Sequence, residues 1–113
     1  MTKQRLQPGE FSKVFGPTPR NKIMECFLEL RSLDNSAGDI AKETGLNRAT
    51  TYNNIALLEK DGYLTKTRKV SGSQLYKLDE KKPEVKILIK VFNMMLTDVA
   101  KRYEKVLKNE VYA

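Results

Sequence analysis

The stretch from Asp39 to Leu64 constrains the fold of this 113-residue chain more than any other part of it. Ala41 lets two helices approach closely, because a larger side chain would push them apart. Gly45, four residues later, can adopt the left-handed backbone conformation that ends a helix. Leu46 can then fit between the two helices, and Asn47 can cap the second one. The spacing therefore predicts two short helices joined by a sharp turn.

Such a pair is a helix-turn-helix, whose second helix is free to lie in a DNA major groove. The same pattern is also typical of a small helical hairpin that binds no DNA. Two further features favour nucleic-acid binding. A basic hairpin follows the second helix directly, and the chain carries 21 Lys and Arg residues against 14 Asp and Glu residues, a net charge of +7.

The positive charge is grouped rather than spread evenly. Residues 63–78 contain Lys66, Arg68, Lys69 and Lys77 without any acidic residue, and residues 1–20 contain four basic residues against Glu10 alone. Residues 21–46 are net acidic by comparison. Positive charge on an arm and a hairpin favours contact with phosphates. The alternative is a solvated basic surface that has no partner.

The composition argues against several classes of function. With no histidine and only Cys26, a monomer cannot build an ordinary zinc site or a Cys–His dyad. Cys26 itself is predicted to be a small buried apolar residue. No set of residues suggests a nucleophile, a base and oxyanion donors together. We therefore expect a protein that is not an enzyme and has no metal or cofactor.

The chain also lacks signals for a membrane or for export. Its first ten residues do not resemble a signal peptide, and Lys86 and Lys90 interrupt the longest apolar run. We therefore expect a cytoplasmic protein that does not associate with a membrane.

The sequence divides into a basic N-terminal arm (residues 1–16), a winged-helix domain (17–80) and a C-terminal dimerisation helix (81–113). Pro8 and Gly9 break the arm, so it is predicted to be extended or a short edge strand, anchored by Phe11, Val14 and Phe15. It could drape over DNA or over a partner, or it could be a frayed terminus.

Local signals place the elements of the central domain, giving a mainly α (α+β) fold. Thr18 and Pro19 suit the cap and first position of a helix. Its apolar stripe consists of Ile23, Met24, Phe27, Leu28 and Leu30. Residues 34–36 end this helix and cap the next. The expected elements that follow are a helix at residues 37–44, a helix from 48 to about 61, strands at 63–70 and 74–78, and a turn at 71–73.

The helix that begins at residue 48 has an unusual outer face. Thr51, Ile55 and Leu58 point to the core, and the opposite face carries short polar groups where Glu and Lys are usual. Asn can bond adenine at two points, and Arg48 can reach guanine or phosphate. As alternatives, the paired asparagines could merely be solvated, and Tyr52 could pack under the hairpin. The predicted DNA-binding residues are Asn47, Arg48, Thr50, Tyr52, Asn53, Lys66, Arg68, Lys69 and Ser73.

A long helix is predicted from Pro83 to about Asn109. Two apolar strips run along it: Val85, Leu88, Phe92, Met95 and Val99 in one, and Ile89, Leu96, Tyr103 and Leu107 in the other. One strip can cover the domain while the other meets a second subunit, or the helix could fold back wholly on its own domain. The predicted dimer seam consists of Val85, Leu88, Phe92, Met95, Val99 and Tyr103. A homodimer would space two recognition helices one DNA turn apart.

Residues 50–55 (TTYNNI), followed by residues 58–64 (LEKDGYL), resemble the recognition helix and wing entry of winged-helix regulators of the MarR/ArsR-like group, including small archaeal members. Residues 17–30 resemble the first helix of such archaeal proteins, and the likeness covers about residues 15–78. It implies that Arg48, Thr50, Tyr52 and Asn53 face DNA and that residues 68–74 touch the flanking backbone. The chain departs from the family pattern at Asn53, where arginine is frequent, and at Thr51, where valine is frequent.

Together these features predict a homodimeric, sequence-specific regulator of transcription that binds double-stranded DNA. The alternative is a winged helix that serves as a protein-interaction module of a transcription complex.

Overall fold

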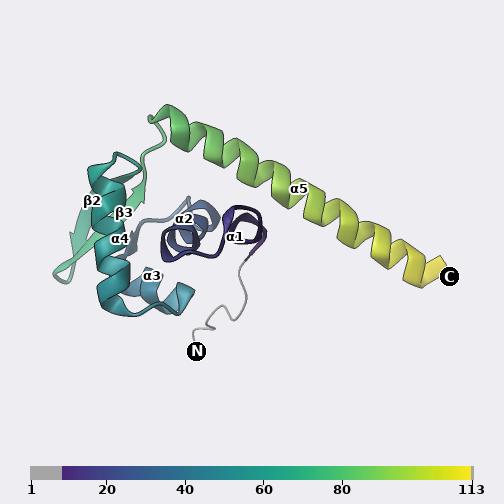
Figure 1. The fold of residues 1–113 in the computed structure, drawn as a ribbon, viewed down its shortest axis with the longest axis horizontal. Coiled ribbons are helices and arrows are strands. Elements are labelled where there is room, and N and C mark those ends of the chain that lie inside the picture. The colour runs from purple at the N-terminus through teal and green to yellow at the C-terminus, as the bar shows by residue number, and fades with distance from the viewer. Residues whose placement is uncertain (1–8, 113) are drawn as a thin grey trace.

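The computed structural model describes the backbone of residues 9–112 and the side chains of residues 9–109. Five helices and a three-stranded sheet make up this part of the chain (Figure 1). In chain order they are α1 (Glu10–Phe15), α2 (Pro19–Glu29), β1 (Asn35–Ser36), α3 (Ala37–Thr44), α4 (Arg48–Lys60), β2 (Leu64–Val70), β3 (Ser73–Leu78) and α5 (Pro83–Tyr112).

Helix α2 lies at the centre of the fold, with α1, α3 and α4 packed around it (Figure 1). It starts as predicted, since the Thr18 side chain accepts a hydrogen bond from the Asn21 amide and Pro19 takes the first helical position. Six consecutive residues, 23–28, are buried rather than one stripe. A helix that neighbours enclose on several sides buries more than one face. Cys26 is buried among them, as expected.

The structure differs from the predicted arm where residues 10–15 form α1. Phe11 is buried, whereas Val14 and Phe15, the other predicted anchors, are exposed. The carboxylate of buried Glu25 accepts hydrogen bonds from the Gly9 amide and the Ser12 amide, both at 3.0 Å. It thus satisfies amides that the start of a helix leaves unpaired. Residues 1–8 of the predicted arm lie outside the described residues.

The α3–turn–α4 unit follows the predicted local signals. Ser36 and Asp39 form a capping box, in which each side chain accepts the other residue's amide at 3.1 Å. Gly45 ends α3 with a φ of 75°, in the left-handed region. The Asn47 side chain then caps α4 by accepting the Thr50 amide at 2.8 Å.

The sheet contains one strand more than the sequence predicted. Its strand order is β1-β3-β2 with antiparallel pairing, so the two residues of β1 join the hairpin to the segment before α3. Such a short strand carries no periodicity that a sequence could reveal. Leu64, Leu75 and Leu78 are buried and hold the base of the hairpin in the core.

Helix α5 has two halves with different surroundings, and it ends at Tyr112 rather than near Asn109. Its first half packs on the domain, where Val85 and Phe92 are buried and Leu88 and Met95 are partly buried against the same core. All described side chains from residue 96 onward are exposed, and this half projects from the domain (Figure 1). The helix is therefore not folded back wholly on its own domain.

This arrangement corrects part of the predicted dimer seam. Val85 and Phe92 are 0% and 5% exposed within their own domain, so no partner can reach them in this conformation. The strip that they begin covers the core first and only then emerges, leaving Val99 and Tyr103 exposed.

Candidate nucleic-acid interface

The outward face of α4 is open to solvent. Arg48, Ala49, Tyr52, Asn53 and Ala56 are all exposed, with Tyr52 at 53%. The inward face consists of three residues that are at most 1% exposed: Thr51, Ile55 and Leu58. Tyr52 is therefore not packed under the hairpin, and the predicted division of the helix into two faces is confirmed.

Two polar side chains of α4 are occupied within the helix. The Thr51 hydroxyl donates to the Asn47 carbonyl at 2.9 Å, which explains how a buried position accepts threonine in place of valine. The Asn54 side chain donates to the Thr50 carbonyl at 2.9 Å. Asn53 is exposed beside it, so Asn53 is the asparagine that can reach outward.

An open groove of about 580 Å³ lies between the N-terminal ends of α3 and α4 and the wing, as we call the β2–β3 hairpin. The lining side chains near α4 are Arg48 and Tyr52, and those on the wing include Lys66, Lys69 and Ser73. The structure thus brings together five of the nine predicted DNA-binding residues. Thr50, Asn53 and Asn47 lie on α4 or its cap outside this lining, and Arg68 lies elsewhere on the wing.

Several residues that line the groove were not predicted from the sequence, and Lys42, Gly38 and Tyr76 are among them. Lys42 is exposed on α3 and adds a fourth cation to Arg48, Lys66 and Lys69, whereas Asp39 is the only acidic residue in the lining. The position of Lys42 in the sequence gave no signal by itself, because only the fold turns this side of α3 toward the wing.

The cations around the groove differ in whether they already have partners. Among the described residues, Arg48, Lys42 and Lys69 make no ion pair, whereas Lys66 lies 3.8 Å from a Glu59 carboxylate oxygen. The Arg48 guanidinium lies beside the start of α3, since a β-carbon added at Gly38 would be 3.9 Å from its Nη2 atom. A cation that has no partner in the protein is free to form charge-assisted hydrogen bonds with an incoming anion.

Arg68, which was predicted to contact DNA, makes an ion pair with Asp34 while its side chain stays exposed. Its Nε donates to Asp34 Oδ2 at 2.9 Å and its Nη2 donates to Asp34 Oδ1 at 3.2 Å. The Thr67 hydroxyl donates to the same Oδ2 at 2.7 Å. The hydrogen bonds from Arg68 and Thr67 lower the pKa of Asp34 from 3.8 to about 2. In return, the hydrogen bonds that Arg68 donates to the Asp34 carboxylate raise the pKa of Arg68.

Tyr76 lines the groove, and its phenol keeps its proton more firmly than that of a free tyrosine. Its burial raises the pKa of its phenol, and the nearby Glu59 carboxylate and the Tyr52 phenol raise it further. A neutral phenol can donate a hydrogen bond to an anion in this groove.

The tip of the wing is a tight two-residue turn. Ser71 and Gly72 have φ values of 51° and 82°, which is the backbone of a type I′ hairpin turn. Nothing lies within 4 Å of a β-carbon added at Gly72, so the tip is free to meet a partner.

Helices α3 and α4 form a helix-turn-helix, and the wing lies beside them. The fold is a winged helix-turn-helix. Residues 19–74 match a family model described as "HTH domain". No curated protein sequence matches the chain.

Several solved structures share the winged helix. The transcriptional regulator HlyU from Vibrio vulnificus is 24% identical, with 66% of this chain and 74% of that chain covered and a TM-score of 0.54. The adhesin competence repressor AdcR from Streptococcus pyogenes is 16% identical, with 79% and 66% covered and a TM-score of 0.61. Rv0081 from Mycobacterium tuberculosis is 22% identical, with 83% and 89% covered and a TM-score of 0.54. At these identities the likeness establishes the fold, and the finer resemblance to archaeal MarR/ArsR-like regulators stays a prediction.

Two further properties concern the described part of this winged helix. Within it, no helix combines the length and the apolar character needed to cross a bilayer. Over the same residues, no group of three or more cysteine, aspartate or glutamate side chains is placed to hold a metal ion.

Proposed function

We propose that the protein is a homodimeric transcriptional regulator that binds double-stranded DNA in a sequence-specific way and acts by occupying its operator. The observation that carries this proposal is the exposed polar face of α4, with Arg48 and Tyr52 beside a groove that contains four cations.

The two parts of this surface suit two parts of DNA. Arg48 and Asn53 stand on the exposed side of α4, where flanking alanines leave room for close approach to base edges. Lys42, Lys66 and Lys69 line the groove between α3 and the wing, where they can neutralise phosphates and set the register of the helix. A helix in the major groove with a wing on the adjacent backbone satisfies both sets of contacts.

The outer half of α5 supports a second copy of the chain as partner. Leu96, Val99, Tyr103 and Val106 follow one another at intervals of three or four residues, and each is at least 38% exposed. A helix segment of this length is marginal in water without a neighbour to pack on. A matching strip from a second α5 would cover it.

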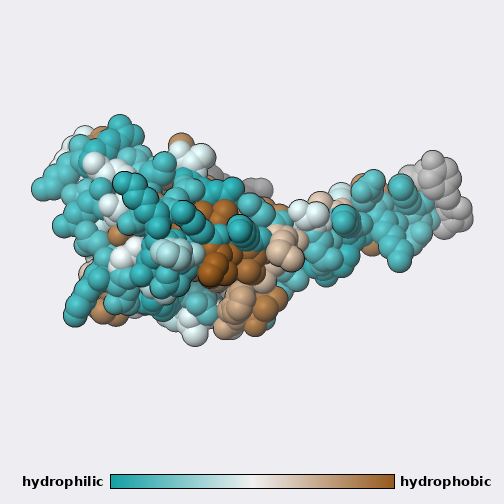
Figure 2. Space-filling view, turned by 90° about the horizontal axis from the view of Figure 1, so that it is seen from above, coloured by the Kyte–Doolittle hydropathy of each residue, from teal (hydrophilic) through white to brown (hydrophobic). Residues whose placement is uncertain are grey.

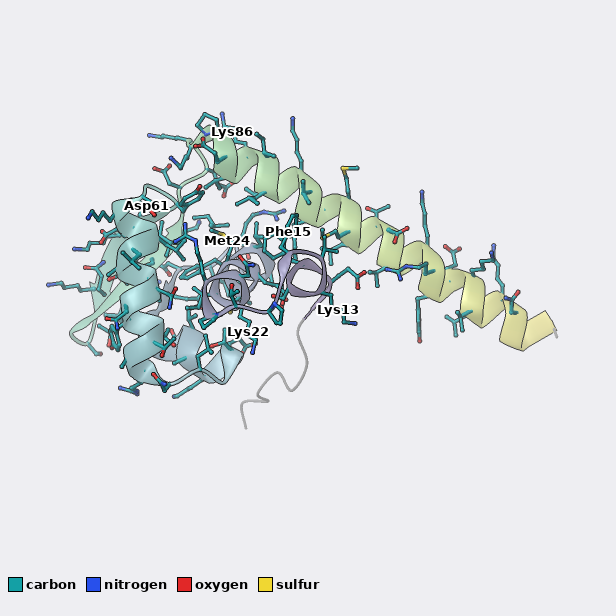
Figure 3. All side chains as sticks on the ribbon, in the orientation of Figure 1. Lys13, Phe15, Lys22, Met24, Asp61 and Lys86 are labelled. Atoms are coloured by element: carbon teal, nitrogen blue, oxygen red, sulfur yellow. The ribbon has the colours of Figure 1, made fainter. Side chains whose placement is uncertain are left out.

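Apolar surface near α1 extends this partner site. Val14, Val91, Met94 and Met95 line a hollow of about 350 Å³ between α1 and α5. Figure 3 shows Phe15 on the side of α1 that faces α5, and this side chain is 52% exposed. Figure 2 shows apolar surface gathered where the globular part meets the projecting helix. Exposed apolar patches of this kind mark association surfaces.

The packing of its first half sets the direction in which α5 leaves the domain, and a surface contact from Arg102 adds to it. The Arg102 Nη2 lies 3.2 Å from Glu10 Oε1 on α1, and its Nε lies 3.1 Å from Asp98 Oδ2 one turn earlier on α5. With the helix direction set, a two-fold pairing of α5 also sets the separation of the two α4 helices.

Selection of a binding site from random duplexes, followed by fluorescence anisotropy over a salt series, tests the DNA proposal. We expect the logarithm of affinity to fall linearly with the logarithm of salt concentration, by about 0.9 for each phosphate contacted. Arg48→Ala together with Asn53→Ala should lower affinity for the selected site at least about tenfold, because a base contact contributes roughly 1–3 kcal/mol. Affinity that hardly responds to salt would contradict the proposal.

Lys86→Ala is the matched control for charge. Lys86 lies at the start of α5, far from α3 and the wing tip (Figure 3). Removing this charge should leave the salt slope and the selected sequence unchanged. If the Arg48 and Asn53 double variant also bound DNA like the wild type, a protein-interaction module would be the better description.

Light scattering during size exclusion tests the dimer. Val99→Asp places a carboxylate in the exposed strip and should give a folded monomer with weakened DNA binding. Thr97→Asp adds the same charge to an exposed residue on the opposite side of α5 and should leave a dimer. A wild-type chain that ran as a monomer at all concentrations would exclude the homodimer.

A further inference from the structure

Three consecutive residues connect the wing to the helix-turn-helix. Asn35 and Ser36 form β1, which pairs with Tyr76 and Leu75 of β3. The Ser36 side chain caps α3 at the same time. Asp34, directly before them, reaches across to β2 with its carboxylate. Besides the buried leucines at the base of the hairpin, this segment therefore helps to position the wing relative to α3 and α4.

The contact between Asp34 and β2 consists of several hydrogen bonds to a mostly buried carboxylate. Its carboxylate accepts three hydrogen bonds at 2.7–3.2 Å, from the Thr67 hydroxyl and from two nitrogens of the Arg68 guanidinium. The Asp34 side chain is only 16% exposed, although that of Arg68 is 66% exposed. Bidentate pairing of this kind fixes geometry as well as charge.

A bulge in β2 makes the contact possible. Successive side chains of a regular strand point to opposite faces, so neighbours cannot normally serve one carboxylate. Here the register shifts by one residue between Lys66, opposite Tyr76, and Lys69, opposite Gln74. A bulge bends its strand and re-aims side chains. The Gln74 side chain completes it by donating to the Arg68 carbonyl at 3.1 Å and to the Leu75 carbonyl at 3.0 Å.

Little else holds the outer part of the wing. In β2 only Leu64 is buried, and all six residues from Thr65 to Val70 are exposed. A two-stranded hairpin is marginally stable on its own. Apart from its pairing with β3, the middle of β2 is held by these hydrogen bonds to Asp34 and by the ion pair of Lys66 with Glu59 at 3.8 Å.

We propose that Asp34 is a positioning residue that latches the wing at the angle where Lys69 and Ser73 line the groove with Arg48, and that Arg68 acts through Asp34 instead of binding a DNA phosphate. This inference rests on the proposed DNA-binding function. It assigns a role to Asp34, and it removes Arg68 from the direct phosphate contacts that the sequence alone predicted.

The direction in which Asp34→Asn changes the affinity for DNA distinguishes the latch from simple electrostatics. Asp34→Asn removes a negative charge near a surface that meets DNA, so long-range electrostatics alone would strengthen binding. The latch requires the opposite. If the wing of Asp34→Asn took the binding angle about one-fifth of the time, the affinity for DNA would fall about fivefold. Apparent affinity scales with the fraction of molecules that can bind. Equal or tighter binding by Asp34→Asn would overturn the proposal.

A charge-neutral double variant tests the role of Arg68. Asp34→Asn with Arg68→Gln replaces the pair by amides and leaves the net charge unchanged. We expect weaker binding with an unchanged salt slope, whereas Lys69→Gln should reduce the slope by about 0.9 because it removes a phosphate contact. A reduced slope in the double variant would mean that Arg68 meets a phosphate, and unchanged affinity would mean that the pair is idle. Either result overturns the latch.

A measurement without DNA distinguishes failure of the latch from failure of the DNA proposal. Amide ¹⁵N relaxation in the free protein should show increased wing motion in Asp34→Asn and in Thr67→Val, which removes one hydrogen bond and no charge. The amides of α4 should keep their wild-type values. Unchanged wing relaxation would refute the latch even if DNA binding held, and absent DNA binding with a loosened wing would refute only the proposed function.

Discussion

The helix-turn-helix and the wing lie side by side at one groove, but different kinds of interaction hold them. The α3–α4 unit is fixed by local caps and by buried side chains such as Ile40, Ile55 and Leu58, none more than 1% exposed. Beyond its base, the wing is fixed by polar contacts, which are the hydrogen bonds to Asp34 and the longer ion pair of Lys66 with Glu59. The rigid part can present base-reading side chains, and the adjustable part can follow a backbone whose shape varies with sequence.

The largest difference between the two regions should appear when side chains are shortened. Leu58→Ala removes a fully buried side chain from α4 and should lower the free energy of unfolding by about 2–5 kcal/mol. Val70→Ala, near the wing tip where the side chain is 46% exposed, should change it by less than about 0.5 kcal/mol. Urea denaturation of both variants measures the contrast, and comparable losses would show that the wing belongs to the cooperative core.

A smaller effect is expected at the cap of α4. Asn47→Ala removes the acceptor for the Thr50 amide and should lower the free energy of unfolding by about 1 kcal/mol. Asn47→Ser keeps a capping oxygen and should restore most of that loss. A serine variant as unstable as the alanine variant would mean that Asn47 stabilises the turn in another way. If stability recovered but DNA affinity did not, Asn47 would also be a DNA contact.

The same contrast explains what the sequence could predict. Helix caps and left-handed glycines act within a few residues, so they can be recognised in the sequence. The caps at Thr18, Ser36 and Asn47 and the turn at Gly45 are examples. The two faces of α4 follow from helical periodicity, which needs no partner to be recognised. The start of α2 and the bounds of α3 and α4 were therefore predicted to within about one residue. The end of α2 was predicted wrongly, since this helix stops at Glu29 and not at residues 34–36, and β1 was not predicted.

Contacts between distant segments could not be predicted in this way. The Glu25 carboxylate caps α1 from 13 residues away, and Asp34 reaches Arg68 across 34 residues. From the sequence alone, Glu25 is simply a polar residue on a helix, and Arg68 is a cation with no evident partner. Likewise, the sequence showed the apolar strip of α5, but it did not show that the first half of this strip covers its own domain. Periodicity shows which face is apolar, not what covers it.

The stability that the wing contact adds should depend on pH, because it involves the Asp34 carboxylate. Hydrogen bonds from Arg68 and Thr67 lower the pKa of Asp34 from 3.8 to about 2 in the folded protein. A carboxyl with a lowered pKa stabilises the fold above its ordinary pKa, and that contribution disappears as the pH falls through the folded value. The difference in unfolding free energy between wild type and Asp34→Asn should therefore be constant above about pH 5 and vanish toward pH 2.

Asp39→Asn provides the comparison for this titration. Asp39 sits in the capping box of α3, and its variant tests whether any carboxylate near the groove gives the same profile. Nuclear magnetic resonance of the wing amides should follow the Asp34 titration, with the midpoint near the folded pKa. A midpoint near 3.8 would mean that the Asp34 hydrogen bonds are absent in solution.

The smallest effect should come from the wing tip. Ser71 has a φ of 51°, a conformation that asparagine adopts more readily at the first position of a type I′ turn. Ser71→Asn should therefore stabilise the turn by a few tenths of a kcal/mol, on the order of its preference for that conformation. Because the outer wing can open without the core, this gain should slow hydrogen exchange of the wing amides and leave global unfolding unchanged. If the amides of α4 slowed equally, the wing and the helix-turn-helix would open as one unit, and the two regions would not differ in cooperativity.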